Sequence, residues 1–285
     1  MDATVTSDRV DVAPPGFDVL DALAIESALQ QAWSGRCQVE AVAVTRSTNE
    51  DLVTRARTQR AHECVLRAAT FQTSGRGRHR RAWHARPGNA LLFSIAVPIA
   101  TAGALPAVTL ACGVAVADCL TRRGLAVQLK WPNDVLVDGR KLAGILSELV
   151  ADSAGRQTLI VGVGVNWNLD GEARRAIGQP AVALEDLMSM RDEQRESWIG
   201  QLGGAVLGAV ERFMRDGFDP FHARFNQLLD ARGEMVNVFE GDREAQPALR
   251  GRVLEVDRSG CLVIEADGVH HAVSSGDVSV RSRGR

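Results

Sequence analysis

The spacing of apolar residues along the chain predicts a series of helices that alternate with strands. Helical spacing, apolar runs of helix length and capping residues predict helices over residues 21–33, 47–60, 105–120, 184–214 and 219–229. Asp21 is in position to cap the first helix, and Asp219-Pro220 opens the last. The chain therefore has enough helix to cover a sheet.

Shorter segments either alternate between apolar and polar residues or are apolar throughout, as strands do. They predict strands over residues 42–45, 64–71, 89–97, 127–131, 142–150 and 159–166. Asp138-Gly139 lies between two apolar runs and is a strong signal for a two-residue hairpin turn. That turn would bring Lys141 back towards Asn133 and Asp134.

The pattern changes near Arg232. Short alternating stretches separated by glycine-containing turns predict a small barrel of about five strands over residues 235–281. We therefore expect one domain over residues 18–231 and a second over 232–285. Residues 1–17 are polar, contain Pro14-Pro15-Gly16 and are expected to be a disordered lead-in.

Composition narrows the class of protein. The chain has 285 residues, 45% of them apolar and 24% charged, and a formal net charge of −2, so attraction of its whole surface to DNA or anionic lipid is not expected. The five cysteines show no metal-ligand spacing, which favours free thiols, with Cys64, Cys112 and Cys119 expected to be buried. No apolar run has the length of a membrane helix and acidic residues interrupt the N-terminus, so a cytoplasmic protein is expected.

A basic, glycine-rich loop over residues 72–83 is the strongest chemical signal. Gly75 and Gly77 alternate with Arg76 and Arg78, and no acidic residue occurs between residues 64 and 117. Glycine lets a backbone approach a ligand closely, and arginine donates paired hydrogen bonds to phosphate or carboxylate. The loop is expected to carry unpaired cations for an anion; the alternative is a solvated basic loop.

Two other segments have the polar or glycine residues of a binding site. Ser47-Thr48-Asn49 either caps a helix or forms a polar corner that faces a ligand. Gly162 and Gly164 interrupt a predicted central strand, and glycine there often marks a place where a ligand lies against the backbone.

Four motifs, in this order, resemble those of biotin–protein ligases. They are S-T-N at 47–49, Q-x-x-G-R-G-R at 72–78 with Trp83 after it, K-W-P-N-D with R-K-L-A-G-I-L across 130–146, and G-V-G-V-N at 162–166. The resemblance extends from about residue 18 to the C-terminus, where G-R-V-L-E-V-D at 251–257 also matches. Each motif alone is weak, but the ordered set is specific.

The resemblance implies a fold and a reaction. The fold would be α+β: a mixed β-sheet with helices, like a class II synthetase, plus a small C-terminal SH3-like β-barrel. The reaction would use ATP and Mg²⁺ to convert biotin to biotinyl-5′-AMP and then transfer biotin to a lysine of a biotin carboxyl carrier protein, with no metal bound by the protein itself. The residues before 18 are too few for a winged helix, so a ligase without an N-terminal DNA-binding domain is expected.

The resemblance also implies which residues form the site. Those expected around biotin are Ser47, Thr48, Asn49, Gln72, Gly75, Arg76, Gly77, Lys141, Gly144, Leu146 and Gly162. Those expected around the nucleotide are Arg78, Trp83, Lys130, Asn133 and Asn166.

Arg76, Arg78 and Lys141 are the candidate catalytic cations, because cations stabilise the charge that develops on the reacting phosphate. Asp134 is either a base for the acceptor lysine or a turn residue, whereas Trp131 is expected in the core. Arg80 replaces a glycine that is common in this family's loop, and it is expected to adopt an ordinary conformation.

Two other functions compete with this one. A lipoate–protein ligase would share the architecture and the adenylation chemistry, but the motifs at 130–146 and the C-terminal β-module favour biotin. A nucleic-acid-binding protein could use the arginine loop, with strongly salt-dependent binding. It is disfavoured because the net charge is −2 and because Trp83 is the only aromatic residue in the loop.

Overall fold

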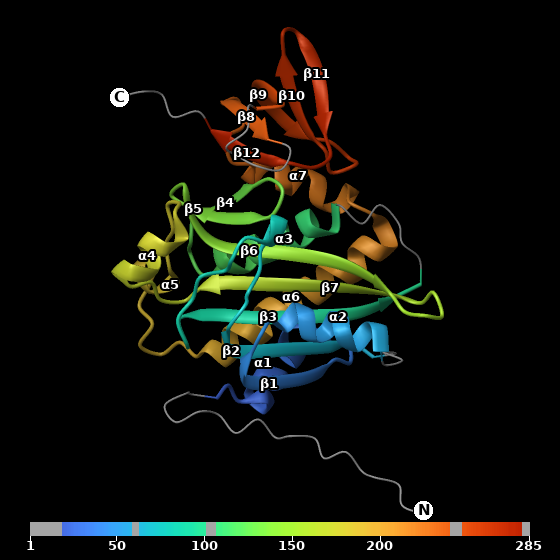
Figure 1. Ribbon diagram of the computed structural model, residues 1–285, viewed down its shortest axis with the longest axis vertical. Helices are drawn as coiled ribbons and strands as arrows, with labels where there is room; N and C mark the ends of the chain where they lie inside the picture. The colour runs from blue at the N-terminus through green and yellow to red at the C-terminus, as the bar shows by residue number, and fades with distance from the viewer. Residues whose placement is uncertain (1–18, 59–62, 101–106, 240–246, 281–285) are drawn as a thin grey trace, which may run out of the picture.

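The computed structural model describes residues 19–58, 63–100, 107–239 and 247–280 (Figure 1). The lead-in expected over 1–17 falls outside these residues, as do the end of the helix expected over 47–60, the start of the one expected at 105, and residues 240–246 and 281–285 of the expected C-terminal module. No helix among the described residues is long and apolar enough to cross a membrane.

A seven-stranded sheet forms the centre of the larger part of the molecule. Its strand order is β1-β2-β3-β7-β6-β5-β4, with β1 parallel to β2 and all other neighbours antiparallel. The strands are β1 Gln38–Thr45, β2 Val65–Gln72, β3 Ala90–Ile99, β4 Val127–Lys130, β5 Asp134–Val137, β6 Arg140–Ala151 and β7 Gln157–Asn166. The expected mixed sheet is thus confirmed, and the Asp138-Gly139 turn joins β5 to β6 with both residues at positive φ.

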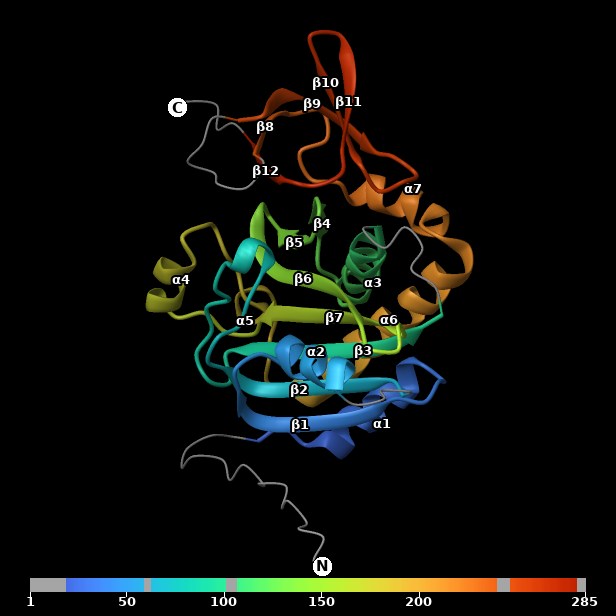
Figure 2. The ribbon, with the colours of Figure 1, turned by 45° about the vertical axis from the view of Figure 1, so that its right-hand side comes forward.

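Helices cover both faces of this sheet. On one face, α6 (Arg195–Asp216) packs against α1 (Ala22–Ala32) and α3 (Val108–Arg122) over the core. On the other face lies α2 (Thr48–Thr58), as Figure 2 shows. Asp21 caps α1 by accepting hydrogen bonds from Leu23 N and Ala24 N, as expected.

The C-terminal β-module is a five-stranded antiparallel sheet of order β11-β10-β9-β8-β12 at the top of Figure 1. Its strands are β8 Met235–Phe239, β9 Leu249–Val256, β10 Leu262–Ala266, β11 Val269–Val273 and β12 Asp277–Val280. The helix α7 (Asp219–Leu228) leads into it, and Asn226 holds Val256 through two 2.8 Å hydrogen bonds, one to its N and one to its O. The Trp131 indole, which is buried as expected, donates to Gly260 O at 3.1 Å and ties the module to the large sheet.

The single helix expected over 184–214 is wrong. Residues 184–187 form the short α5, whose end, Met188, is extended (φ −152°, ψ 160°), and α6 starts only at Arg195. A further helix, α4 (Gly171–Ile177), was not predicted. Its signals were Asp170, which caps its first turn, and Gly178, which ends it in the left-handed region (φ 66°).

The cysteines are free thiols, as expected, but they differ in environment. Cys112 and Cys119 are buried, and burial raises the pKa of Cys112 to about 12. Cys64 is only half-buried, and its Sγ lies 2.6 Å from that of Cys37. A hydrogen bond to Cys37 and then burial raise the pKa of the Cys64 thiol, so it is a poor nucleophile at neutral pH.

Candidate active site

A cavity of about 400 Å³ opens beside the ends of β6 and β7, under the basic loop. This volume lies within the range of small-molecule sites. Every candidate residue except Gly75 lines it: Ser47, Thr48, Asn49, Gln72, Arg76, Gly77, Arg78, Trp83, Lys130, Asn133, Asp134, Lys141, Gly144, Leu146, Gly162 and Asn166. Gly75 lies just behind, where an added Cβ would be 3.0 Å from Gln72 Nε2. The structure brings the candidates together, and their individual roles stay predictions.

The floor of the cavity is a chain of hydrogen bonds at the start of α2. Gln72 Oε1 accepts from Thr48 N at 2.7 Å and lies 3.0 Å from Thr48 Oγ1. Ser94 Oγ lies 2.6 Å from Thr48 Oγ1 and donates to Asn49 Oδ1 at 2.5 Å. Asn49 Nδ2 in turn donates to Glu148 Oε2 at 2.8 Å. The S-T-N segment is therefore a polar corner as well as a helix start.

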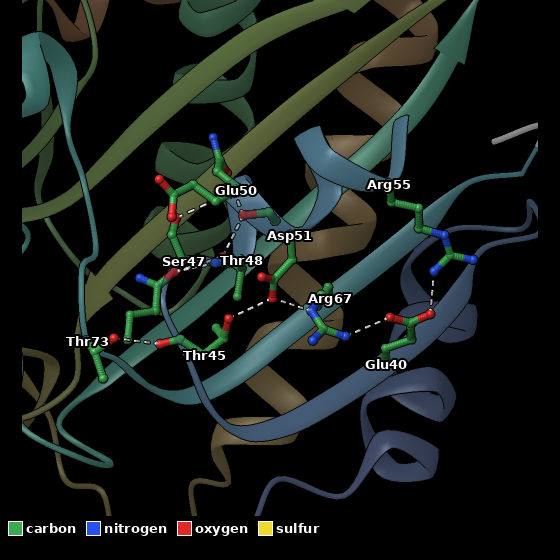
Figure 3. A network of polar contacts seen from close by, with 12 residues as sticks. Glu40, Thr45, Ser47, Thr48, Glu50, Asp51, Arg55, Arg67 and Thr73 are labelled. Carbon is green, nitrogen blue, oxygen red and sulfur yellow. Dashed lines mark hydrogen bonds and ion pairs between the residues drawn. The ribbon is translucent and has the colours of Figure 1, made fainter. Parts of the chain in front are cut away.

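A second polar network holds α2 in place. Arg67, on β2, donates to Asp51 Oδ2 at 2.6 Å and to Glu40 Oε2 at 2.9 Å (Figure 3). Glu40 also accepts from Arg55 at 2.5 Å, and Asp51 accepts from Thr45 Oγ1 at 2.8 Å. Strands β1 and β2 thereby fix the turn of α2 that presents Thr48 and Asn49 to the cavity.

The space above the strand glycines is filled by protein side chains. A Cβ added to Gly162 would overlap Asn49 Oδ1, and one added to Gly164 would lie 2.8 Å from the Trp83 ring. Gly144 faces the same ring at 3.1 Å. Glycine is needed at these positions because Asn49 and Trp83 approach the sheet closely. From the sequence alone, the glycines had been attributed only to a ligand.

The basic loop is folded back on itself over the cavity. Gly77 N donates to Arg81 O at 2.8 Å and Trp83 N to Gly75 O at 2.9 Å. Between them is a short 3₁₀ turn, Arg78–Arg80, in which His79 is the residue at positive φ (53°). Arg80 is not at positive φ, so the ordinary backbone conformation expected for it is confirmed, and the left-handed residue is its neighbour His79. The Arg80 side chain is outside the described part.

The expectation of unpaired cations is wrong for several of these arginines. Arg76 forms an ion pair with Glu50, from the first turn of α2, and Arg86 pairs with Asp170 at 2.9 Å and also with Glu172. Arg78 Nη1 donates to Gly276 O of the β-module at 3.1 Å. Carboxylates from distant parts of the sequence therefore neutralise some of the arginines between residues 64 and 117.

Lys141 and Asp134 form the most enclosed ion pair of the cavity. Lys141 Nζ lies 2.6 Å from Asp134 Oδ1, with side-chain exposures of 18% and 16%. Lys141 Nζ is also 5.5 Å from the centre of the Trp83 ring. Lys130 lines the same cavity, and no other lysine occurs in the sequence. Burial raises the pKa of the nearby Asp230 carboxyl, a shift that Lys130 opposes.

The two asparagines assigned to the nucleotide bind backbone. Asn133 Nδ2 donates to Ile145 O at 3.0 Å. Asn166 Nδ2 donates to Lys141 O at 3.1 Å and to Val182 O at 3.0 Å. Both hydrogens of the Asn166 amide nitrogen are thus used, which leaves its Oδ1 for any ligand.

Sequence reasoning missed several residues of the cavity, among them Ser94, Gln179 and His84. Ser94 had a signal, because it is the single hydroxyl residue in the apolar run 90–97. Gln179 follows the unpredicted helix α4, so nothing in the local pattern placed it there. Among the described residues no group of three or more His, Cys, Asp or Glu could hold a metal ion.

Comparison with known proteins places this arrangement in one family. Residues 41–166 match the biotin/lipoate A/B protein ligase family. The chain is 37% identical over 286 residues to the biotin–[acetyl-CoA-carboxylase] ligase of Mycobacterium tuberculosis, covering 95% of this chain and 98% of that protein. It is 30% identical over 275 residues to the bifunctional ligase/repressor BirA of Salmonella typhimurium, covering 94% of this chain and 81% of that protein.

The fold agrees with these matches. A solved biotin protein ligase from Aquifex aeolicus, in complex with biotin and ATP, superposes with a TM-score of 0.70 at 25% identity, covering 86% of this chain and 98% of that one. The shares of both chains that are covered agree with the sequence matches. The chain therefore belongs to the biotin/lipoate A/B protein ligase family and, within it, to the biotin–protein ligases.

Proposed function

We propose that this protein uses biotin and ATP, with Mg²⁺, to form biotinyl-5′-AMP and then transfers biotin to a lysine of a biotin carboxyl carrier protein. The observation that carries the proposal is the single cavity in which a polar floor, the Lys141–Asp134 pair and the arginine loop meet. The similarity to a biotin–[acetyl-CoA-carboxylase] ligase and to a biotin protein ligase solved with biotin and ATP supports it. A cytoplasmic reaction is proposed with it, because free thiols suit a reducing compartment.

The first step joins two anions. A biotin carboxylate oxygen attacks the α-phosphorus of ATP and pyrophosphate leaves, so negative charge accumulates on the phosphate. In our proposal Lys141 and Arg78 face this charge, while Arg76 leaves Glu50 to bind an anion. The exchange costs little because the Arg76–Glu50 pair is partly exposed, at 39% and 34%.

Mg²⁺ would neutralise charge on the ATP phosphates. Asp134 is the one carboxylate among the described residues that line the cavity, and it is already paired with Lys141. A magnesium ion held mainly by phosphate oxygens suits this site, since magnesium commonly needs only one or two protein carboxylates.

The second step makes an amide bond. The acceptor amine attacks the acyl carbon of biotinyl-5′-AMP, AMP leaves, and the amine loses a proton. An ordinary lysine is mostly protonated near neutral pH, because its pKa is about 10.4. We propose Asp134 as the group that orients or accepts the leaving protons. We also propose that residues 232–285 act as a separate module that helps to dock the carrier.

The direct test is to mix protein, biotin, ATP and Mg²⁺ and detect biotinyl-5′-AMP by mass spectrometry, then add a carrier domain. Biotin should be incorporated and lipoate should not, because the relative at 37% identity and the superposed structure are biotin ligases. Incorporation of lipoate alone would contradict the proposal. The nucleic-acid alternative has lost its main support, because Arg76 and Arg86 pair with carboxylates.

The two loop arginines should have separable effects. Arg76→Ala is expected to weaken biotin binding by about tenfold and release adenylate into solution, whereas Arg78→Ala should mainly weaken ATP binding, since charge-assisted hydrogen bonds are worth about 1.5–3 kcal/mol. Isothermal titration with each ligand measures both. Arg57→Ala, which removes an exposed arginine outside the cavity lining, is the control. Equal loss of both ligands in both variants would contradict the assignment.

A further inference from the structure

Ser94 lies at the centre of the cavity floor, although no motif marks it. It lies on β3 opposite Gly162 of β7, its exposed fraction is 0%, and it lines the cavity. Its Oγ is within 2.6 Å of Thr48 Oγ1 and 2.5 Å of Asn49 Oδ1. A buried hydroxyl with two such neighbours must have defined donor and acceptor roles.

The direction of each hydrogen bond follows from Glu148. An ionised carboxylate can only accept, so the Asn49 amide nitrogen must face Glu148, at 2.8 Å. Asn49 Oδ1 then faces Ser94 and can only accept, so the Ser94 proton points to Asn49. The lone pairs of Ser94 are thus left to accept the single hydroxyl proton of Thr48, whose Oγ1 lies 2.6 Å from Ser94 Oγ and 3.0 Å from Gln72 Oε1. Hence one exposed carboxylate sets the proton positions of three buried groups.

The backbone of Thr48 fixes the orientation of the Gln72 amide. The Thr48 backbone N–H can only donate, so Gln72 must turn its Oε1 towards it, at 2.7 Å. Gln72 Nε2 therefore points towards Gly75 and the loop. The floor then offers a fixed donor, Gln72 Nε2, and a fixed acceptor, the lone pairs of Thr48 Oγ1.

We propose that Ser94 is a positioning residue that, under the control of Glu148, fixes this donor and acceptor for a cyclic urea. The urea of biotin has one carbonyl oxygen flanked by two N–H groups, and it needs a donor and an acceptor side by side. Without Ser94, the Thr48 hydroxyl can turn to donate elsewhere and the Asn49 amide loses its buried partner. The proposal rests on the proposed function, because it takes biotin as the ligand.

Ser94→Ala is the first test, measured by biotin titration and by steady-state kinetics on the full chain. We expect the dissociation constant and KM for biotin to rise about tenfold, since an unpaired buried hydrogen-bonding group is left behind, while KM for ATP and kcat stay within threefold. Ser147→Ala is the matched control: Ser147 is on β6 of the same sheet, separated from β3 by β7, and its hydroxyl pairs with Thr109, outside the cavity lining. It should leave the biotin values unchanged.

Glu148→Gln is the second test, and it involves an exposed side chain, so folding is not at risk. Glutamine can donate as well as accept, so Asn49 can flip, and we expect biotin binding to weaken about threefold. The double variant Ser94→Ala/Glu148→Gln should bind no more weakly than Ser94→Ala, because both changes act through one chain of bonds. Additive effects would contradict that chain.

Two outcomes separate the proposal from the function on which it rests. If the unaltered protein forms no biotinyl-5′-AMP, the proposed function fails. If the unaltered protein forms the adenylate but the Ser94→Ala and Glu148→Gln variants bind biotin with the same affinity as the unaltered protein, only the role of Ser94 is wrong. A fall in melting temperature for Ser94→Ala with an unchanged biotin KM would show a purely structural hydroxyl and would also overturn it.

Discussion

Replacing Lys141 with alanine is expected to reduce adenylate formation by about 10²–10³-fold, the usual effect of removing one group that stabilises transition-state charge. Lys141 is the cation closest to the carboxylate of the cavity, 2.6 Å from Asp134, and the Asp138-Gly139 turn holds its strand in place. Its loss also leaves Asp134, 16% exposed, without that partner, so some loss of stability is expected. Pyrophosphate release measures the rate, and thermal unfolding measures the fold.

The control for Lys141→Ala is Arg140→Ala. Arg140 is the preceding residue of the same strand, its side chain is 41% exposed, and its carboxylate partner Asp138 lies in the hairpin turn at 3.5 Å. Removing it deletes the same unit of charge from the same hairpin outside the cavity lining. Pyrophosphate release should stay near that of the unaltered protein. If Lys141→Ala also stays within a few-fold, the role assigned to Lys141 is wrong.

Gly162→Ala is expected to weaken biotin binding by at least tenfold. The new methyl group would overlap Asn49 Oδ1, so Asn49 must move and break its bonds to Ser94 and Glu148. Overpacking a buried site costs about 1–3 kcal/mol, and 1.4 kcal/mol is already tenfold in affinity. Biotin titration and thermal unfolding measure the two effects.

Gly208→Ala is the matched control for Gly162→Ala. Gly208 lies in α6, and an added Cβ there would meet no atom within 4 Å. Alanine should favour the helix slightly, by about 0.5–1 kcal/mol, and leave biotin binding unchanged. Normal biotin affinity in Gly162→Ala would mean that Asn49 does not have to keep its place.

The elements that the sequence predicted well are those with local signals. The Asp21 cap, the Asp138-Gly139 turn and the long apolar run of β3 determine their structures within a few residues, and all three are confirmed. The break after Leu187 was missed because helical residues continue on both sides of it. Local preference alone does not show where two helices separate to follow the core.

The sequence predicted which residues form the site better than it predicted the contacts between them. The motifs contain most of the residues that line the cavity, and the fold brings together the start of α2, the loop after β2 and the strands β6 and β7 that carry them. The pairing of Arg76 with Glu50 and the contact of Arg78 with Gly276 join segments far apart in sequence. Such partners depend on tertiary packing, which spacing along the chain does not contain.

Both lysines of the chain line the cavity, and this limits where the enzyme can biotinylate its own side chains. An acyl adenylate that escapes from its site reacts with nearby ε-amines, and enzyme surfaces usually carry many of them. Here every other side-chain cation is an arginine, whose guanidinium keeps its proton and is not an acyl acceptor. Self-biotinylation would thus be confined to Lys130, Lys141 and the α-amino group, and an amine-reactive label on this chain would report almost directly on occupancy of the site.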